Sequence, residues 1–341
     1  MFHVGITMGC PVGIGPEIIL KYFRDNVADR DVVPVVLGDI KVLERCAREL
    51  GIRQICSAWN PGDPLPNDAI PVMPVSSLDA GALRWGQPDC ETGRAMADYI
   101  KTAVRLIQDG ILDAMATCPI SKKSLHDAGY TFPGHTEMLA HLTGGREPVM
   151  MMAGTRLKVT LVTIHCSLAD VPSGINQASV DRIIRVTHRA LVSDFNIRRP
   201  RIAVAGLNPH AGEQGLFGNE EAKILTPVVE KAQREAIDIQ GPYPPDTVFY
   251  RAAAGEFDAV VCMYHDQGLI PFKLLHFSDG VNVTLGLPLV RTSVDHGTGY
   301  DIAGKGLANP QSLAAAVQMA GSIARNRREN GARIVAIRGL C

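Results

Sequence analysis

The stretch that most constrains this chain is a short apolar run that ends abruptly in polar, chemically capable residues. Residues 259–263 are nearly all apolar, which is typical of a β-strand covered on both faces. Tyr264, His265, Asp266 and Gln267 follow at once. The pattern predicts a buried strand that carries a histidine and a carboxylate to its carboxyl end.

Two more apolar runs end in a histidine in the same way. Residues 159–164 run into His165, and residues 202–207 run into a segment that contains His210. In open α/β sheets the functional crevice lies outside the carboxyl ends of the strands, so we expect the three imidazoles to lie close together. One histidine after a strand is more often a hydrogen-bonded loop residue than a ligand, but three in one structural position favour a divalent metal with open coordination positions.

Length and charge limit the classes of protein to which the chain can belong. A chain of 341 residues exceeds the size at which one core stops growing, so two domains are expected. The 34 basic and 35 acidic residues balance, and there is no basic run of the kind that nucleic-acid binding requires. The sequence shows neither a signal peptide nor a membrane-spanning stretch, and its cysteines form no Cys-x-x-Cys pair. We expect a soluble cytoplasmic protein.

The first strand-to-helix junction is rich in glycine. Residues 4–8 predict a strand, Gly9, Gly13 and Gly15 follow, and Pro16 and Glu17 mark the start of a helix. The spacing is not the Gly-x-Gly-x-x-Gly of dinucleotide-binding proteins. An anion- or cofactor-binding loop and a tight structural turn both remain open.

Further polar residues stand at strand ends and helix starts. His135 and Thr136 open a helix, where they could hold an anionic group or serve as a local cap. Asp246, on a proline-led segment, could orient a substrate hydroxyl and accept its proton, or could cap the helix that follows. Lys273 and Arg291 follow the third histidine closely, as a phosphorylated or carboxylated substrate would require.

At this point the chain resembles the 4-hydroxythreonine-4-phosphate dehydrogenase family over nearly its whole length. The motifs that carry the resemblance are residues 13–17, 134–137, 207–213, 245–247, 263–268, 281–288 and 291–297. The resemblance implies an α/β fold of the isocitrate/isopropylmalate dehydrogenase type, with two α/β/α domains and the active site in the cleft between them, working as a homodimer. We expect the first domain to comprise residues 1–130 plus 280–341, and the second to comprise residues 131–279.

The resemblance also implies roles for individual residues. It places the metal ligands, contributed from both subunits, at His165, His210 and His265, and the metal is a divalent ion such as zinc, cobalt, manganese or magnesium. The substrate-binding positions fall on His135, Thr136, Lys273, Asn282 and Arg291. Asp246 and Asp266 match acidic residues near the substrate and are the candidate catalytic residues.

A wider similarity, to the β-decarboxylating dehydrogenases, suggests the cofactor site. In those enzymes a His-Gly loop and the segment after it wrap the adenosine end of the cofactor, and residues 296–310 reproduce that pattern. The matching residues are His296, Gly297, Asp301, Ile302 and Asn309. A carboxylate at Asp301 would bind the ribose hydroxyls and repel a 2′-phosphate, which favours NAD over NADP.

The implied reaction is oxidation of the C3 hydroxyl of 4-phosphohydroxy-L-threonine, followed by decarboxylation to 3-amino-2-oxopropyl phosphate in pyridoxal phosphate biosynthesis. One departure bears on the substrate: Cys10 stands where the family usually has an acidic residue. Relatives that oxidise 4-phospho-D-threonate or 4-phospho-D-erythronate, a terephthalate cis-dihydrodiol dehydrogenase and a non-catalytic metal-binding homologue are the alternatives.

Overall fold

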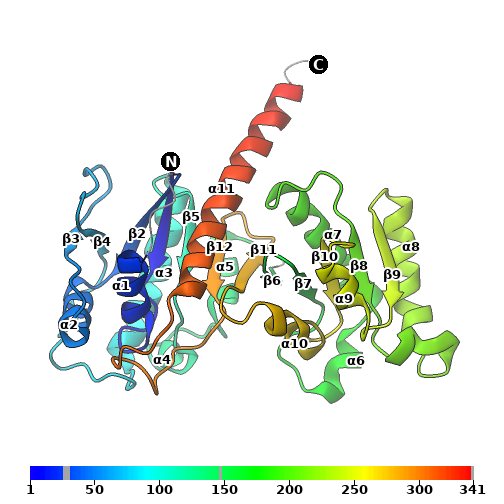
Figure 1. Ribbon diagram of the computed structural model, residues 1–341, viewed down its shortest axis with the longest axis horizontal. Coiled ribbons are helices and arrows are strands. Elements are labelled where there is room, and N and C mark those ends of the chain that lie inside the picture. Colours follow the sequence, from blue (N-terminus) through cyan, green and yellow to red (C-terminus); the bar gives the residue numbers. More distant parts are fainter. Residues whose placement is uncertain (26–30, 146–147, 339–341) are drawn as a thin grey trace. The chain divides into compact units, whose positions relative to one another are not determined.

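The computed structural model describes residues 1–25, 31–145 and 148–338 (Figure 1). The chain divides into two compact units. Unit 1 comprises Met1–Pro148 and Leu287–Arg325, and unit 2 comprises Val149–Gly286 and the residues from Asn326 onward. Strands and helices alternate in both units, so the chain has the mixed α/β fold that the sequence predicts.

In unit 1 the neighbouring strands pair in parallel, and every strand except β3 is followed along the chain by a helix. In spatial order the strands are β3 (Cys56–Ala58), β4 (Ile70–Pro74), β2 (Val32–Gly38), β1 (Phe2–Thr7), β5 (Ala114–Thr117) and β12 (Arg291–Val294). The helices are α1 (Gly15–Asp25), α2 (Ile40–Leu50), α3 (Cys90–Gln108), α4 (Lys122–Asp127), α5 (His135–Thr143) and the first part of α11 (Gln311–Arg338).

Local sequence signals account for the ends of these helices. The Asp39 side chain caps α2 by accepting hydrogen bonds from the N–H groups of Lys41 and Val42, and Gly51 ends the helix in the left-handed conformation at φ 64°. Asp89 and Thr92 form a reciprocal capping box at the start of α3. These caps fix the starts of α2 and α3.

Unit 2 contains parallel strands and one antiparallel insertion. In spatial order its strands are β11 (Val281–Leu285), β6 (Val149–Ala153), β7 (Lys158–Leu161), β10 (Ala259–Cys262), β8 (Ile202–Ala205) and β9 (Ile239–Tyr243). Its helical segments are η1 (Leu168–Asp170), α6 (Val171–Gly174), α7 (Gln177–Ser193), η2 (Pro209–Gly215), η3 (Glu221–Leu225), α8 (Thr226–Arg234), α9 (Val248–Ala253) and α10 (His265–Leu275). Only β6 runs antiparallel to both of its neighbours, β11 and β7, among the strands described for this unit.

The division of the chain differs in position from the expected domain boundaries at residues 130 and 279. Helix α5 packs against α3, so residues 131–145 belong to unit 1. Strand β11 pairs with β6, which keeps Val281–Leu285 in unit 2. The physical reason in both cases is pairing with an element that the apolar pattern alone does not reveal.

Each unit has its own apolar core. In unit 1 residues such as Met96, Ile100 and Leu139 are fully buried on α3 and α5. In unit 2 Val159, Val260 and Phe272 form the corresponding core around β7 and β10. No helix in the described part of the chain combines the length and the apolar character that crossing a membrane requires.

Candidate active site

The three strand-end histidines follow three neighbouring strands. Strand β10 pairs in parallel with β7 on one side and with β8 on the other, with Val260 opposite Val159 and Val261 opposite Val204. Parallel strands bring their carboxyl ends to one edge. The segments that carry His165, His210 and His265 therefore all begin at the same edge of unit 2.

Two of these histidines lie next to one another. The ring centroids of His165 and His265 are 5.8 Å apart. His265 is the first residue of α10, and its Nδ1 lies 2.7 Å from Oδ1 of Asp266. A carboxylate on one ring nitrogen holds the imidazole in place and leaves Nε2 available to a metal. Two imidazoles so arranged suit a divalent first-row metal.

His210 lies in a loop of unusual backbone conformation. His210, Ala211, Glu213 and Gln214 all have positive φ, between 40° and 57°, and Gly212 between them has φ 82°. Non-glycine residues rarely adopt this conformation, which costs roughly 1–2 kcal/mol each, so a run of four requires support from the surroundings. The His210 ring lies beside Phe217, with ring centroids 6.1 Å apart.

A buried carboxylate supports this loop. Oε1 of Glu221 accepts hydrogen bonds from the N–H groups of Leu207 and Asn208, both at 2.8 Å, and Oε2 accepts one from Nδ2 of Asn208 at 3.0 Å. Glu221 is 5% exposed. Sequence analysis missed this residue, because nothing in an isolated Glu-Glu pair signals that one member is buried.

The three imidazoles do not form a complete ligand set within one chain. Across residues 1–25, 31–145 and 148–338, no group of three or more His, Cys, Asp or Glu side chains is arranged to hold a metal ion. The structure pairs His165 with His265 and places His210 after the adjacent strand. The three-histidine metal site stays a prediction.

A second cluster, in unit 1, has the properties of an anion site. Arg291 begins β12 and is only 4% exposed, and its Nε and Nη2 donate to Oγ1 of Thr117 at 3.1 and 2.8 Å. Burial lowers the pKa of the Arg291 guanidinium to about 10, which leaves it charged at neutral pH. A buried charge of this kind is stabilised by a bound anion.

His135 faces the same cluster. It is the first residue of α5, whose N-cap residue Gly134 gives no side-chain cap, so neither His135 nor Thr136 acts as the local cap. The His135 Nε2 atom is buried and has no hydrogen-bond partner within the described structure. Burial, together with the charges of Arg291 and Lys122, holds the pKa of His135 well below its ordinary value, so the ring is neutral. An uncapped helix start, a buried guanidinium and an unpaired ring nitrogen fit a phosphate group.

The remaining substrate and catalytic candidates lie in unit 2. Lys273 stands in the last turn of α10 and is half-buried, and Asn282 lies on β11 and is also half-buried. Asp246 is exposed, and the N-cap of α9 is Thr247. The interpretation of Asp246 as a helix cap is therefore wrong, because the helix begins one residue later.

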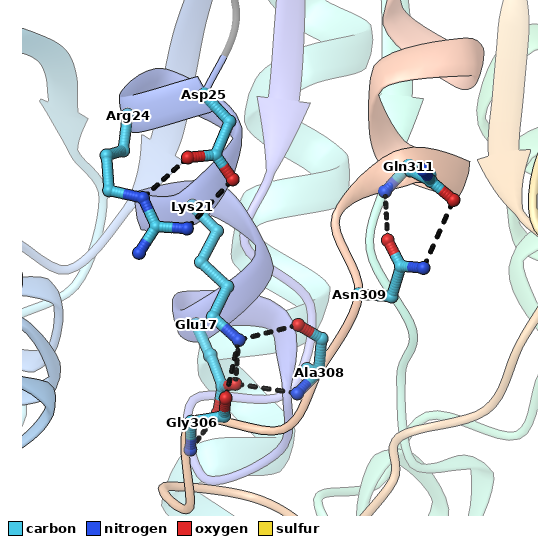
Figure 2. Close-up of polar contacts among 8 residues, drawn as sticks. All are labelled: Glu17, Lys21, Arg24, Asp25, Gly306, Ala308, Asn309 and Gln311. Atoms are coloured by element: carbon cyan, nitrogen blue, oxygen red, sulfur yellow. Dashed lines mark hydrogen bonds and ion pairs between the residues drawn. The ribbon is translucent and has the colours of Figure 1, made fainter.

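The candidate cofactor loop lies in unit 1, between β12 and α11. His296 and Ile302 are half-buried, whereas Gly297 and Asp301 are exposed, and a side chain at Gly297 would meet open space. The exposed carboxylate of Asp301 is chemically suited to accept hydrogen bonds from ribose hydroxyls. Asn309 uses its Oδ1 to accept a hydrogen bond from the N–H of Gln311 at 2.9 Å, where α11 starts (Figure 2).

Packing accounts for two of the N-terminal glycines. A Cβ atom at Gly15 would lie 2.0 Å from the carbonyl oxygen of Met8, and one at Gly9, where φ is 69°, would lie 2.4 Å from that of Pro119. No side chain fits at either position. These contacts favour the structural turn over a binding loop for the glycine-rich junction.

Cys10, the departure from the family pattern, is completely buried. The hydroxyl of Tyr300 donates to its Sγ at 3.4 Å, and burial raises the pKa of the Cys10 thiol. The thiol is therefore neutral at physiological pH. It packs as a small apolar residue against the core of unit 1.

Known proteins resemble this chain over almost its full length. The family model described as pyridoxal phosphate biosynthetic protein PdxA matches residues 30–320. A 4-hydroxythreonine-4-phosphate dehydrogenase of Desulforapulum autotrophicum is 53% identical over 93% of this chain and 94% of its own, and one of Desulfosudis oleivorans is 52% identical with the same coverage. A crystal structure of a 4-hydroxythreonine-4-phosphate dehydrogenase from Klebsiella pneumoniae, 42% identical, superimposes with a TM-score of 0.87 over 95% of this chain and 98% of that one.

Proposed function

Because the chain belongs to the PdxA family of pyridoxal phosphate biosynthetic proteins, we propose that it oxidises 4-phosphohydroxy-L-threonine at C3 with NAD. Its relatives are named dehydrogenases, and the chain is an enzyme of that class. The observation that carries the choice of a phosphorylated substrate is the buried Arg291 beside the unpaired Nε2 of His135 at the uncapped start of α5.

In this proposal Arg291, His135 and the first N–H groups of α5 bind the substrate phosphate. The guanidinium is already held by Thr117 at two nitrogens, so it loses little side-chain freedom when the anion binds. The neutral His135 ring offers one N–H or one lone pair, so the tautomer can adapt to the phosphate oxygen that it meets. Thr136, Lys273 and Asn282 complete the substrate-binding set that the family resemblance implies.

Asp301 is proposed to bind the adenosine ribose of NAD, with His296, Gly297, Ile302 and Asn309 around it. Its carboxylate accepts hydrogen bonds from both ribose hydroxyls and repels a 2′-phosphate, so NADP is disfavoured. Bound NAD would accept the hydride from the substrate. The oxidised acid then loses CO₂ to give 3-amino-2-oxopropyl phosphate.

His165, His210 and His265 are proposed to bind a divalent metal, with zinc, cobalt, manganese and magnesium as candidates. Such an ion would lower the pKa of the substrate hydroxyl and stabilise the charge that decarboxylation creates. Asp266 orients His265 through Nδ1. Asp246, exposed on its proline-led segment, is the carboxylate proposed to take the hydroxyl proton.

We also propose that the enzyme works as a homodimer. Ile270 and Leu274 lie one helical turn apart on α10 and are 60% and 82% exposed, and Phe277 just beyond the helix is 81% exposed. Large apolar side chains grouped in this way usually contact a partner. A second copy of the chain that covers this face would lie against the helix that begins with His265. Leu274→Glu should then shift the protein towards monomer in light scattering, and an unchanged mass would exclude this face.

The direct test of the proposed activity is NADH formation by the purified enzyme supplied with a divalent metal, NAD and 4-phosphohydroxy-L-threonine. Parallel assays with 4-phospho-D-threonate and 4-phospho-D-erythronate separate the amino acid from the sugar acids by kcat/KM. We expect the amino acid to be preferred. Preference for either sugar acid would replace the proposed substrate, and no turnover with any of them would remove the activity.

A further inference from the structure

Glu17 is a buried carboxylate that accepts hydrogen bonds from backbone groups outside its own helix. It stands in the first turn of α1 and is 1% exposed. Its Oε1 accepts a hydrogen bond from the N–H of Ala308 at 2.7 Å, and its Oε2 accepts one from the N–H of Gly306 at 3.2 Å. Figure 2 shows the carboxylate turned toward the loop that contains both residues. Glu17 therefore does more than mark the start of α1, because it also binds the loop that contains Gly306 and Ala308.

Lys21, one helical turn further along α1, contacts the same loop as a hydrogen-bond donor. Its Nζ donates to Oε1 of Glu17 at 2.8 Å, to the carbonyl of Gly306 at 2.8 Å and to the carbonyl of Ala308 at 2.7 Å (Figure 2). An ammonium group has three protons, and these contacts use all of them. Glu17 and Lys21 together hold the N–H and the carbonyl of both Gly306 and Ala308.

The loop needs such support, because it has no regular structure of its own between residues 301 and 310. Gly304 and Gly306 have φ of 73° and 74°, a conformation that glycine adopts at a large cost in entropy. A second anchor lies at Gly304, where a Cβ atom would come within 2.5 Å of the Trp85 indole. The loop is thus fixed at two points, one apolar and one ionic.

The Glu17–Lys21 ion pair carries a desolvation cost, so its contribution to stability alone does not account for it. A buried carboxylate and a largely buried ammonium lose their hydration, and an apolar contact of similar volume often stabilises a fold as well or better. Here the charges are matched to backbone groups of one loop, at distances of 2.7 to 3.2 Å. The pair fixes the position of four backbone groups at once, which an apolar contact would not do.

We propose that Glu17 and Lys21 are positioning residues that keep the loop of residues 301–310 in the conformation that binds the adenosine end of NAD. This inference rests on the proposed function, because it takes that loop as the cofactor site. Without the clamp, only a fraction of molecules would have the loop ready, and the apparent Kd for NAD would rise by the inverse of that fraction. The chemical step uses other residues, so it should proceed normally once NAD is bound.

The test uses the full-length enzyme and three substitutions in α1. Glu17→Gln keeps the size of the side chain, but its amide can accept only at one atom and turns a donor toward Lys21 or the loop. Lys21→Met keeps the stem and removes the ammonium group. Arg24→Ala is the matched control, because Arg24 pairs with Asp25 at the exposed end of the same helix, away from the loop (Figure 2). Thermal unfolding checks that each variant is folded.

We expect the Kd for NAD, measured by titration calorimetry without substrate, to rise about tenfold in Glu17→Gln and in Lys21→Met, the effect of losing one charge-assisted hydrogen bond. The KM for NAD should rise in parallel, whereas kcat at saturating NAD and the KM for the phosphorylated substrate stay at wild-type values. Hydrogen exchange at the amides of Gly306 and Ala308 should be faster in both variants without NAD. Arg24→Ala should change none of these.

Two results would overturn the inference. One is wild-type NAD affinity in both folded variants, and the other is an equal fall in kcat and rise in both KM values, which describes general damage to the fold. If the wild-type protein itself binds no NAD, the proposed function fails, and the cofactor role of the clamp falls with it. Faster exchange at the two loop amides would in that case show a clamp that serves only the fold.

Discussion

Removal of the Glu221 carboxylate should destabilise the loop that carries His210, and the structure allows the size of the effect to be worked out. The side chain is 5% exposed and accepts three hydrogen bonds at 2.8, 2.8 and 3.0 Å, two of them from backbone N–H groups. Glu221→Ala leaves those two N–H groups without a partner, at about 1–3 kcal/mol each. Relaxation of the positive-φ residues returns roughly 1 kcal/mol, so the net loss is about 1–5 kcal/mol.

Urea denaturation measures this loss as a shift of the unfolding midpoint at constant slope. Hydrogen exchange at the amides of Leu207 and Asn208 should accelerate in the same variant, which detects local opening of the loop as well as global unfolding. Glu230→Ala is the matched control, because Glu230 lies on α8 with 59% of its side chain exposed and its Oε2 lies 4.0 Å from Nη1 of Arg234. That substitution should stay within about 0.5 kcal/mol of wild type.

A Glu221→Ala protein with the wild-type midpoint and wild-type exchange at both amides would refute this reasoning. Glu221→Gln refines the test, because the glutamine oxygen can still accept from both N–H groups. We expect it to lose about 1–2 kcal/mol, less than the alanine variant, since only the charge and the bond from the Asn208 amide are affected. Equal losses in the two variants would mean that side-chain volume, not hydrogen bonding, supports the loop.

Three further predictions address the other parts of the site. Asp266→Asn should weaken divalent-metal binding by about 10–100-fold in a calorimetric titration, because His265 loses the carboxylate on its Nδ1, and unchanged affinity would exclude that orienting role. Asp301→Ala should raise the KM for NAD and reduce discrimination against NADP, whereas unchanged cofactor kinetics would reject the loop as the adenosine site. Burial keeps the pKa of His135 in the folded protein well below 6.5. As the pH falls, the unfolded chain therefore takes up the proton first. The stability that the neutral ring contributes is complete above pH 6.5 and is lost below it. In urea denaturation, the free energy of unfolding of His135→Gln should therefore fall less between pH 6.5 and 5 than that of wild type. An equal fall in the two proteins would contradict a neutral His135 ring.

Apolar runs in the sequence predict much of the fold, because parallel strands that are buried on both faces consist of consecutive apolar residues. The runs before His165, His210 and His265 are β7, β8 and β10, although each strand ends earlier than its run. Helix α11 runs from Gln311 to Arg338 and passes through Gly331, a residue type that often ends a helix, so its length could not be read from the local pattern.

Other elements cannot be found from local patterns. Helix α10 begins at His265 itself and contains Pro271, which argues against a helix in sequence. Strand β6 is antiparallel to both neighbours, and its partners β7 and β11 are fixed only by tertiary pairing. The domain boundaries depend on that pairing, so they could not be placed from the sequence.

The candidate site shows the same limit. Residue type and position relative to strands identify His265 and Arg291, because a charged or ligating side chain directly beside a buried apolar strand is visible in the sequence and lies where α/β proteins bind ligands. Glu221, which supports the His210 loop, and Glu17, which supports the loop of residues 301–310, depend on burial and on partners 13 to 291 positions away along the chain. Such contacts leave no periodic trace in the sequence.

The most direct test of the central claim, that the Arg291 cluster binds a substrate phosphate, compares kcat/KM for 4-phosphohydroxy-L-threonine and for its dephosphorylated form in wild type and in Arg291→Met. We predict that wild type prefers the phosphorylated form by at least about a hundredfold, the value of a buried guanidinium–phosphate contact, and that Arg291→Met loses most of this preference. If Arg291→Met kept the wild-type preference, or if wild type used both forms equally well, the phosphate would bind elsewhere and the account of this site would be contradicted.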